Sequence, residues 1–342
     1  MKKSIVFLVL VVFSLSFSNM LFAQRGSSSQ GDTLEVRLAS FMPRNSDWGR
    51  TLDKMAAEWA RVTNNAVRLI IIHDGLEGSE QKTLSSMSTN NIQAGLFTSF
   101  GLIHICPSVM TLSAPFCIRT EAELDLVLKD TRPLLDAQTS KTDFISLALI
   151  KGGWVNIFSK EPVVVPDDLR RLKLASNPEE AKLNAAFKAM GFNLVESEMT
   201  DLGPKIASNM VNAFYQTPAS VAPLGLYKML NNMMDTPIAP FLGGIVINRV
   251  TWNKISSDNR ARILQVTQKT AADFEAVMPR TVTNAITMMQ REGLKVNKVS
   301  PSQEQLWQTE VQKAMPSLLG NTFDPELYNK MNEILRKSRT GK

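Results

Sequence analysis

The sequence predicts an α/β fold of two lobes, and three observations support this prediction. Short strand patterns alternate with helical patterns over residues 34–137, which is typical of parallel strands joined by helices. The same alternation starts again after residue 160. Two long apolar segments, 144–158 and 237–248, flank this second set, and a pair of glycines interrupts each of them. Because both segments are longer than a typical strand, we expect the chain to cross between the lobes at each.

The first lobe is predicted from alternation and from helix caps. Leu34, Val36 and Leu38 alternate with charged residues, which predicts a strand. The segment 67–73 is apolar on both faces, so this strand is expected to be buried on both. The order strand, helix, strand, helix, strand implies parallel pairing through right-handed crossovers. The expected elements are strand 34–38, a helix from Ser46 to about residue 60, strand 67–73, helix 79–89, strand 93–99, and a helix that Thr120 and Glu123 cap and that runs to about residue 137.

The second lobe is predicted in the same way. Asn177-Pro178 can start a helix, and Gly191 can end it. Residues 258–291 form one long helical pattern, with Pro279 inside it as an expected kink. The expected elements are strand 172–175, helix 177–189, strand 193–196, helix 201–209, strand 211–216, helix 258–291, and helices that begin at Ser300 and Asp324. We place the first lobe at residues 34–150 and about 243–275, and the second at 151–242 and about 276–340.

Residues 1–33 are expected to precede the folded lobes. Lys2 and Lys3 come before the apolar run 5–13, which is the pattern of a signal peptide, and Ala23 is the expected last residue before cleavage. Residues 24–33 are polar and rich in Gly and Ser, which predicts a flexible leader. An uncleaved anchor is the alternative. In both cases we expect the lobes in the periplasm.

The composition is that of a globular protein and excludes several function classes. Of the 342 residues, 44% are hydrophobic, and the net charge is only +6 without a basic stripe, so nucleic-acid binding is not expected. Two Cys and two His exclude a disulfide scaffold and most metal clusters. We expect no metal and no cofactor. Cys106 and Cys117 fit either a disulfide or two free thiols.

Catalytic motifs are mostly absent. His73-Asp74 resembles a general base with its orienting acid, but no nucleophile elbow, Cys–His set or P-loop accompanies it. A lone His at a strand end is usually structural, so we do not expect an enzyme. His104 is expected in the packed core or in a loop, and Glu179-Glu180 on a solvated face. Two lobes joined by crossing strands instead predict a ligand cleft at the carboxyl ends of the strands, which closes by hinge motion.

Five short motifs occur in the order and spacing of a known family. They are Pro107 with 113–116 (SAPF) for an "L-P-F" loop, 166–173 (PDDLRRLK) for "D-L-K-G-L-K", 189–191 (AMG) for "A-L-G-A", 211–218 (VNAFYQTP) for "V-D-G-x-E-x-P", and 245–256 (IVINRVTWNKIS) for a strand followed by "W-x-x-L". With these motifs, the sequence from Leu34 to about Gly293 resembles the DctP-type periplasmic solute-binding proteins of TRAP transporters. The resemblance implies two α/β lobes, hinge strands and a long helix that spans both lobes.

The resemblance also implies a function and a set of cleft residues. Family members capture a small solute in the periplasm and deliver it to a membrane permease of two subunits, driven by an ion gradient. The usual solute is an organic acid, whose carboxylate an Arg clamps by a bidentate bond. This sequence has Ala175 at that position, and Trp154 and Val155 where a second Arg often follows the hinge glycine. The inferred cleft lining is largely apolar: Phe41, Thr98, Trp154, Val155, Ala175, Met199, Gln216, Ile238 and Phe241.

An apolar lining predicts a hydrophobic or amphipathic ligand, such as a lipid-like molecule or an apolar amino-acid derivative. A buried carboxylate without a cation costs several kcal/mol, whereas burying an apolar chain stabilises by roughly 0.8 kcal/mol per CH₂. An alternative is that a displaced cation, Lys173, Arg171 or Lys151, binds an organic acid. A second alternative is an envelope scaffolding protein without a ligand.

Clefts without the family Arg resemble those of TRAP systems that have an additional periplasmic partner built of TPR repeats. We therefore expect the permease subunits and such a TPR-repeat protein as partners. The candidate docking surfaces are the region Met229–Met234 and the C-terminal helices. Core packing is the other explanation of the closely spaced Met229, Met233 and Met234.

Overall fold

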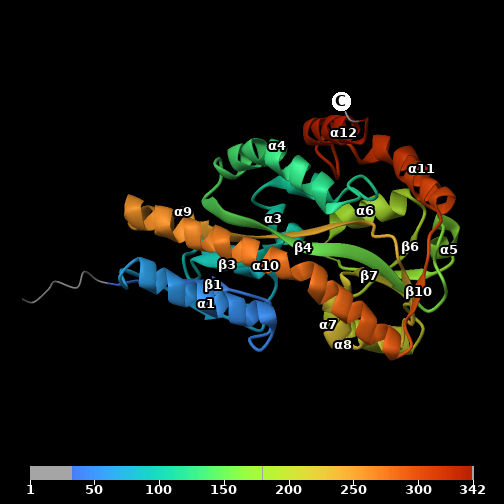
Figure 1. Ribbon diagram of the computed structural model, residues 1–342, viewed down its shortest axis with the longest axis horizontal. Helices are drawn as coiled ribbons and strands as arrows, with labels where there is room; N and C mark the ends of the chain where they lie inside the picture. The colour runs from blue at the N-terminus through green and yellow to red at the C-terminus, as the bar shows by residue number, and fades with distance from the viewer. Residues whose placement is uncertain (1–32, 179, 341–342) are drawn as a thin grey trace, which may run out of the picture. The chain divides into compact units, whose positions relative to one another are not determined.

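The computed structural model describes residues 33–178 and 180–340. The predicted signal peptide, 1–23, and nearly all of the predicted leader, 24–33, lie outside the described residues. Within the described part, no helix combines the length and the apolar character that a membrane span needs. The fold is α/β, as predicted, with a mixed sheet covered by helices (Figure 1).

The first half of the sheet contains the three predicted parallel strands. β1 (Leu34–Ala39) pairs in parallel with both β2 (Val67–Ile72) and β3 (Ala94–Thr98). α1 (Asp47–Val62) connects β1 to β2, and α2 (Glu80–Ser88) connects β2 to β3. The caps expected from the sequence are present, since Ser46 Oγ accepts a hydrogen bond from Gly49 N at 3.0 Å. These elements confirm the predicted alternation.

Two long antiparallel strands join the halves of the sheet. β4 (Phe144–Ser159) pairs with β9 (Ala239–Asn248) along most of its length and then with β7 (Ala213–Gln216) and β8 (Asn232–Met234). The register shifts between Lys151 and Trp154, where the predicted glycine pair stands. Gly153 has a φ of 95°, a backbone conformation that residues with a side chain rarely adopt. The glycines therefore allow a local bulge while the strand continues.

The second half of the sheet carries the site described below. β5 (Lys173–Ser176) pairs in parallel with β6 (Asn193–Glu196) and β7 (Ala213–Gln216), and the strand order is β2-β1-β3-β9-β4-β7-β5-β6. Two three-residue strands, β8 (Asn232–Met234) and β10 (Lys295–Asn297), were not expected from the sequence. The intervening helices are α5 (Pro166–Arg170), α6 (Ala181–Ala189), α7 (Met199–Ala207) and α8 (Pro218–Leu224).

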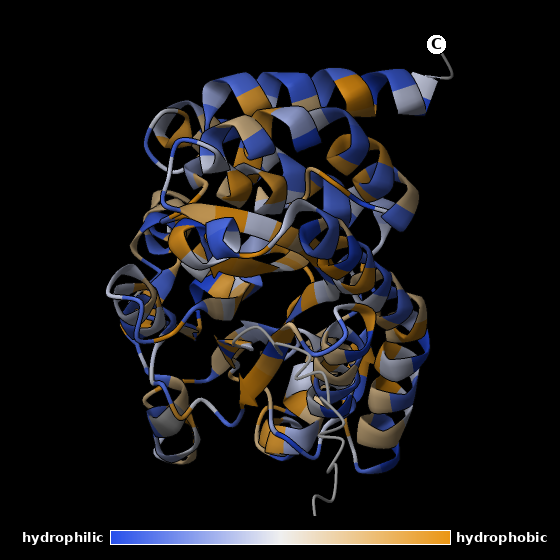
Figure 2. Ribbon diagram, turned by 90° about the vertical axis from the view of Figure 1, so that its left-hand side faces the viewer, coloured by the Kyte–Doolittle hydropathy of each residue, from blue (hydrophilic) through white to orange (hydrophobic). Residues whose placement is uncertain are grey.

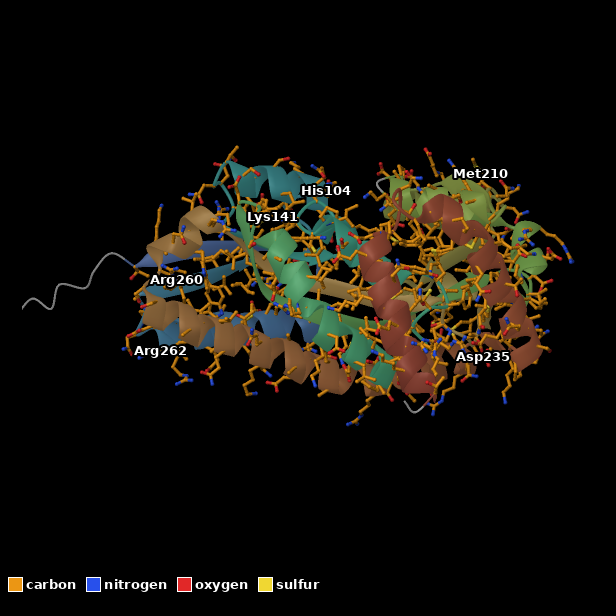
Figure 3. The ribbon with its side chains drawn as sticks, turned by 90° about the horizontal axis from the view of Figure 1, so that it is seen from above. His104, Lys141, Met210, Asp235, Arg260 and Arg262 are labelled. Atoms are coloured by element: carbon orange, nitrogen blue, oxygen red, sulfur yellow. The ribbon has the colours of Figure 1, made fainter. Side chains whose placement is uncertain are left out.

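One helix packs against both halves, as the resemblance implied. α10 (Ser257–Arg291) is 35 residues long, contains Pro279, and runs from beside α1 to beside α8 (Figure 1). Phe274 and Met278 belong to the core of β1–β3, whereas Met289 belongs to the core of β7 and α7. Figure 3 agrees with this course, because Arg260 and Arg262 near the helix start lie at the opposite end of the view from Asp235 and Met210.

The last helix of the chain packs against a helix that precedes β4. α12 (Pro325–Thr340) packs against α4 (Glu121–Thr139), so a contact crosses the predicted division into 34–150 and 276–340, and the lobe boundaries stay a prediction. Apolar strands lie inside and helices of mixed polarity outside (Figure 2). The other helical elements are α3 (Ser99–Leu102), η1 (Pro107–Ser113), η2 (Leu226–Lys228), α9 (Arg249–Lys254) and α11 (Pro301–Leu318).

Candidate functional site

A cavity of about 120 Å³ lies where the carboxyl ends of the strands in the second half meet α3 and η1. The ends of β5 and β7 form one wall, and the start of β9 and the residues before it form another. Open α/β sheets place ligands at this edge of the sheet. Its described lining is Ser99, Phe100, Met110, Ser113, Pro115, Val155, Ala175, Ser176, Asn177, Glu180, Leu183, Phe187, Ser197, Met199, Leu202, Phe214, Tyr215, Gln216, Ile238, Ala239, Pro240 and Phe241.

Six of the nine residues predicted for the cleft line this cavity. Ala175, where the sequence resemblance places an Arg, is 5% exposed near the end of β5. Gln216 ends β7, where its Oε1 accepts a hydrogen bond from Thr217 N at 2.8 Å. The six are Val155, Ala175, Met199, Gln216, Ile238 and Phe241.

Three predicted residues are not among the described lining residues, and two of them make hydrogen bonds to other groups. Thr98 caps α3, and its Oγ1 donates to the carboxylate of Glu80 at 3.0 Å. Trp154 directs its indole N–H to Glu121 Oε1 at 2.7 Å, beyond the register shift in β4. Phe41 lines a separate small hollow beside Glu80. The contribution of these three side chains to a ligand site stays a prediction.

The cavity has a polar end that sequence reasoning missed. The sequence predicts Glu180 on a solvated face, but it is only 8% exposed and lines the cavity. Tyr215 donates its hydroxyl proton to Glu180 Oε2 at 2.5 Å. Burial, and then the charge and hydrogen bond of Glu180, raise the pKa of Tyr215 well above its ordinary value. The phenol therefore stays protonated. No local signal could reveal this pair, because 35 residues separate its members.

The three cations considered as replacements for the missing Arg are not among the described lining residues. Lys151 is paired with Glu121, Asp125 and Glu275, at 3.6, 2.6 and 3.4 Å. Lys173 Nζ donates to the backbone oxygen of Asn209, and Arg171 is exposed near Asp168. In the described part of the lining there is no Lys, Arg or His.

The structure does not arrange His73 and Asp74 as a general base with its orienting acid. His73 is buried and bonds through Nε2 to Asp53 at 2.8 Å, so the neighbouring Asp74 does not orient it. Asp74 instead accepts a hydrogen bond from the backbone N–H of Arg44. His104 is exposed in the turn after α3, so the loop alternative holds and the core alternative is wrong (Figure 3). Neither His lines the cavity.

The structure also shows the state of the two cysteines and the burial of the closely spaced methionines. Cys106 and Cys117 are free thiols, which favours the second of the two alternatives. Met233 and Met234 are buried in β8, so core packing accounts for them. Within the region Met229–Met234 only Met229 and Asn231 are exposed.

The comparisons with known proteins agree with this geometry. Residues 38–320 match the family model DctP, bacterial extracellular solute-binding protein, family 7, so the chain belongs to this family. A solute-binding protein of Sulfitobacter sp. (strain NAS-14.1) is 26% identical over 170 residues, which are 48% of this chain and 51% of that protein. The chain thus matches about half the length of this curated relative.

Solved structures show the same fold over nearly the whole chain. A TRAP periplasmic solute-binding protein from Chromohalobacter salexigens, with bound D-glucuronate, has a TM-score of 0.79 at 17% identity, covering 88% of this chain and 99% of that one. A second, from Ochrobactrum anthropi with its C-terminus bound in the ligand-binding pocket, has a TM-score of 0.81 at 18% identity, covering 91% and 97%. The two-lobed periplasmic-binding-protein fold is therefore confirmed. The family consists of substrate-binding transport proteins and not enzymes.

Proposed function

We propose that the chain is the periplasmic solute-binding component of a TRAP transporter, which captures a small solute and delivers it to the membrane permease subunits. Membership of the DctP family and the shared fold of TRAP proteins support this role. The cavity supports it as well, because it lies at the strand ends where such lobes close on a ligand. A scaffolding protein would have no need of this cavity.

The ligand class that we propose rests on one observation, which is the apolar character of the described cavity wall. Val155, Ile238 and Phe214 present hydrocarbon, and Ala175 stands where the resemblance places an Arg. Burial of hydrocarbon stabilises a bound ligand, whereas a carboxylate would be desolvated without a cation. The ligand we propose is therefore hydrophobic or amphipathic.

An organic acid remains the second candidate, since the Chromohalobacter protein has bound D-glucuronate. For this candidate, Lys173, Arg171 or Lys151 would have to leave its present position and reach the cavity. Lys151 would have to leave three carboxylates to do so. Removing a partner from such a cluster leaves charges unpaired, which opposes the movement.

Two measurements test the proposal. Native mass spectrometry of protein purified without denaturation should show a retained apolar molecule. Calorimetric titration should show binding of 1-hexanol and none of D-glucuronate. Tight D-glucuronate binding that is lost in Lys173→Ala or Lys151→Ala would show that the organic-acid candidate is correct. A chain that retains no molecule and binds neither compound would contradict the solute-binding role.

A matched pair of variants tests the apolar wall itself. Val155→Ala removes two methyl groups from the cavity, so the dissociation constant for 1-hexanol should rise about tenfold, at roughly 0.8 kcal/mol per group. Val250→Ala makes the same change on an exposed turn of α9 and should leave binding unchanged. Equal effects of the two substitutions would contradict the assignment of Val155 to the ligand site.

The proposed TPR-repeat partner rests on the resemblance alone. The surface it would contact is formed by Met229 and the C-terminal helices, since Met233 and Met234 are buried. Purification of the chain from its native envelope should recover a TPR-repeat protein, and a Met229→Asp variant should recover less of it. Recovery that is equal for both chains would show that Met229 is not part of the contact.

A further inference from the structure

Glu180 and Tyr215 place two hydrogen-bond acceptors close together in the cavity wall. Glu180 contributes a carboxylate, and Tyr215, whose proton is directed to Glu180, contributes the lone pairs of its phenol oxygen. Both residues line the cavity, as do Ser176 and Asn177 at the end of β5. The remaining described lining is mainly apolar. A ligand that fills the cavity would therefore contact these acceptors as well as hydrocarbon.

Ser176 gives an independent indication that a ligand group belongs here. It is 2% exposed and lines the cavity, and its Oγ has no hydrogen-bond partner in the structure. Buried polar groups are nearly always hydrogen-bonded, because an unsatisfied buried hydroxyl is destabilising. A ligand donor at this end would satisfy Ser176 Oγ.

The charge of the Glu180 carboxylate determines which head group of a ligand is favoured. A carboxylate at the cavity surface repels a carboxylate of the ligand and attracts a cation. The described lining contains no Lys, Arg or His. An ammonium group has three donors and no acceptor, which complements a cluster of acceptors.

The size of the cavity limits the apolar body. Its volume of about 120 Å³ is of the same order as a cavity of roughly 150 Å³ that holds one benzene molecule. A long acyl chain would require the walls to separate, whereas a ring or a short branched chain fits.

We propose that this cavity binds a small amine, whose ammonium head group lies between Glu180, Tyr215 and Ser176 and whose apolar body packs against the remaining wall. This inference rests on the proposed solute-binding function and narrows its ligand class. It differs from the organic-acid candidate in the sign of the ligand charge.

Three probes with the same phenylethyl body test the head group. They are 2-phenylethylamine, 2-phenylethanol and 3-phenylpropionate, each titrated calorimetrically into the full chain. We expect the amine to bind about tenfold or more tightly than the alcohol, because a hydrogen bond to a charged group is worth roughly 1.5–3 kcal/mol. The acid should bind most weakly. An acid that binds more tightly than the amine overturns the proposal without any variant.

Substitutions test whether Glu180 causes the tighter binding of the amine. Glu180→Gln should weaken amine binding about tenfold while changing alcohol binding less than about threefold. Glu333→Gln, on the exposed face of α12, is the matched control and should change neither. Tyr215→Phe keeps the carboxylate of Glu180, so this variant should still bind the amine more tightly than the acid. It tests the proposal if Glu180→Gln does not fold.

The outcomes separate this inference from the function on which it rests. Equal binding of amine and alcohol, unchanged by Glu180→Gln, overturns the ammonium site and leaves the apolar ligand class intact. Binding of D-glucuronate with no binding of the three probes overturns both. No binding of any probe, with an apolar molecule retained in native mass spectra, overturns the amine alone.

Discussion

At the scale of single residues, Asp324 connects the last helix to the middle of the chain. Its Oδ1 accepts a hydrogen bond from Leu327 N at 2.9 Å, which caps α12, and its Oδ2 accepts from Ser108 Oγ at 2.5 Å. Burial raises the pKa of this carboxyl, but the hydrogen bonds of Ser108, Leu327 and Glu326 outweigh it, so the pKa is lowered overall. The carboxylate form is therefore the one that stabilises the fold.

We predict that Asp324→Asn makes the free energy of unfolding less dependent on pH. A lowered native pKa means that the unfolded state binds the proton more tightly, so this contribution is present above the unfolded pKa of about 3.9 and is lost as the pH falls through the native value. Urea unfolding at pH 7 and pH 3 should show a smaller difference in the variant. Asp130→Asn, on exposed α4, is the control and should retain the wild-type difference.

The two thiols give a second prediction at this scale. Burial raises the pKa of Cys106 and of Cys117 to about 11, so little reactive thiolate is present at pH 8. Iodoacetamide should modify the folded protein slowly, and it should add two groups after unfolding without reductant. A mass 2 Da below that of the reduced chain, with no added groups, would instead reveal a disulfide.

At the scale of elements, the glycine pair in β4 couples the strand to the cavity. Gly153 requires a positive φ, and a Cβ on it would meet only Met278 and Val282 at ordinary contact distances. Gly152 has an ordinary φ, but a Cβ would approach Phe241 Cδ1 to 2.5 Å. Because Phe241 lines the cavity, crowding at Gly152 is transmitted to the ligand site.

Gly153→Ala should therefore affect mainly stability, whereas Gly152→Ala should affect ligand binding. Gly153→Ala should lower the free energy of unfolding by about 1–2 kcal/mol through backbone strain, with little change in ligand affinity. Gly152→Ala should displace the Phe241 ring and weaken 1-hexanol binding several-fold. Thermal unfolding and calorimetric titration of both variants make the comparison. Equal loss of affinity in both would mean that the bulge, and not the contact with Phe241, determines the site.

Elements also show which parts of the fold can be predicted from sequence. The strands β1–β3 and β5–β7 carry local alternation or apolar runs, and their parallel pairing follows from the connecting helices. β8 and β10 have three residues each, too few for a pattern, and their pairing joins segments more than 60 residues apart. The Glu180–Tyr215 pair was missed for the same reason. Motifs could suggest the six apolar and polar residues that line the cavity, but the Glu180–Tyr215 pair depends on tertiary contacts.

At the scale of the whole molecule, long elements connect the two halves of the sheet. Trp59, in the core of the first half, donates its indole N–H to Thr267 Oγ1 of α10 at 3.1 Å. The same helix ends in the core around Met289. β4 and β9 also pass between the halves. Unfolding of either half would expose apolar surface of these shared elements.

We therefore predict that the chain unfolds in one cooperative transition. Circular dichroism and tryptophan fluorescence should give the same urea midpoint. Trp59→Phe and Trp307→Phe remove indoles from different cores, and each should lower that single midpoint while the two probes still coincide. The loss of each indole hydrogen bond, to Thr267 or to Val164, should lower stability by about 1 kcal/mol. Two separate transitions, with Trp59→Phe shifting only one, would show that α10, β4 and β9 do not couple the halves and that the halves fold independently.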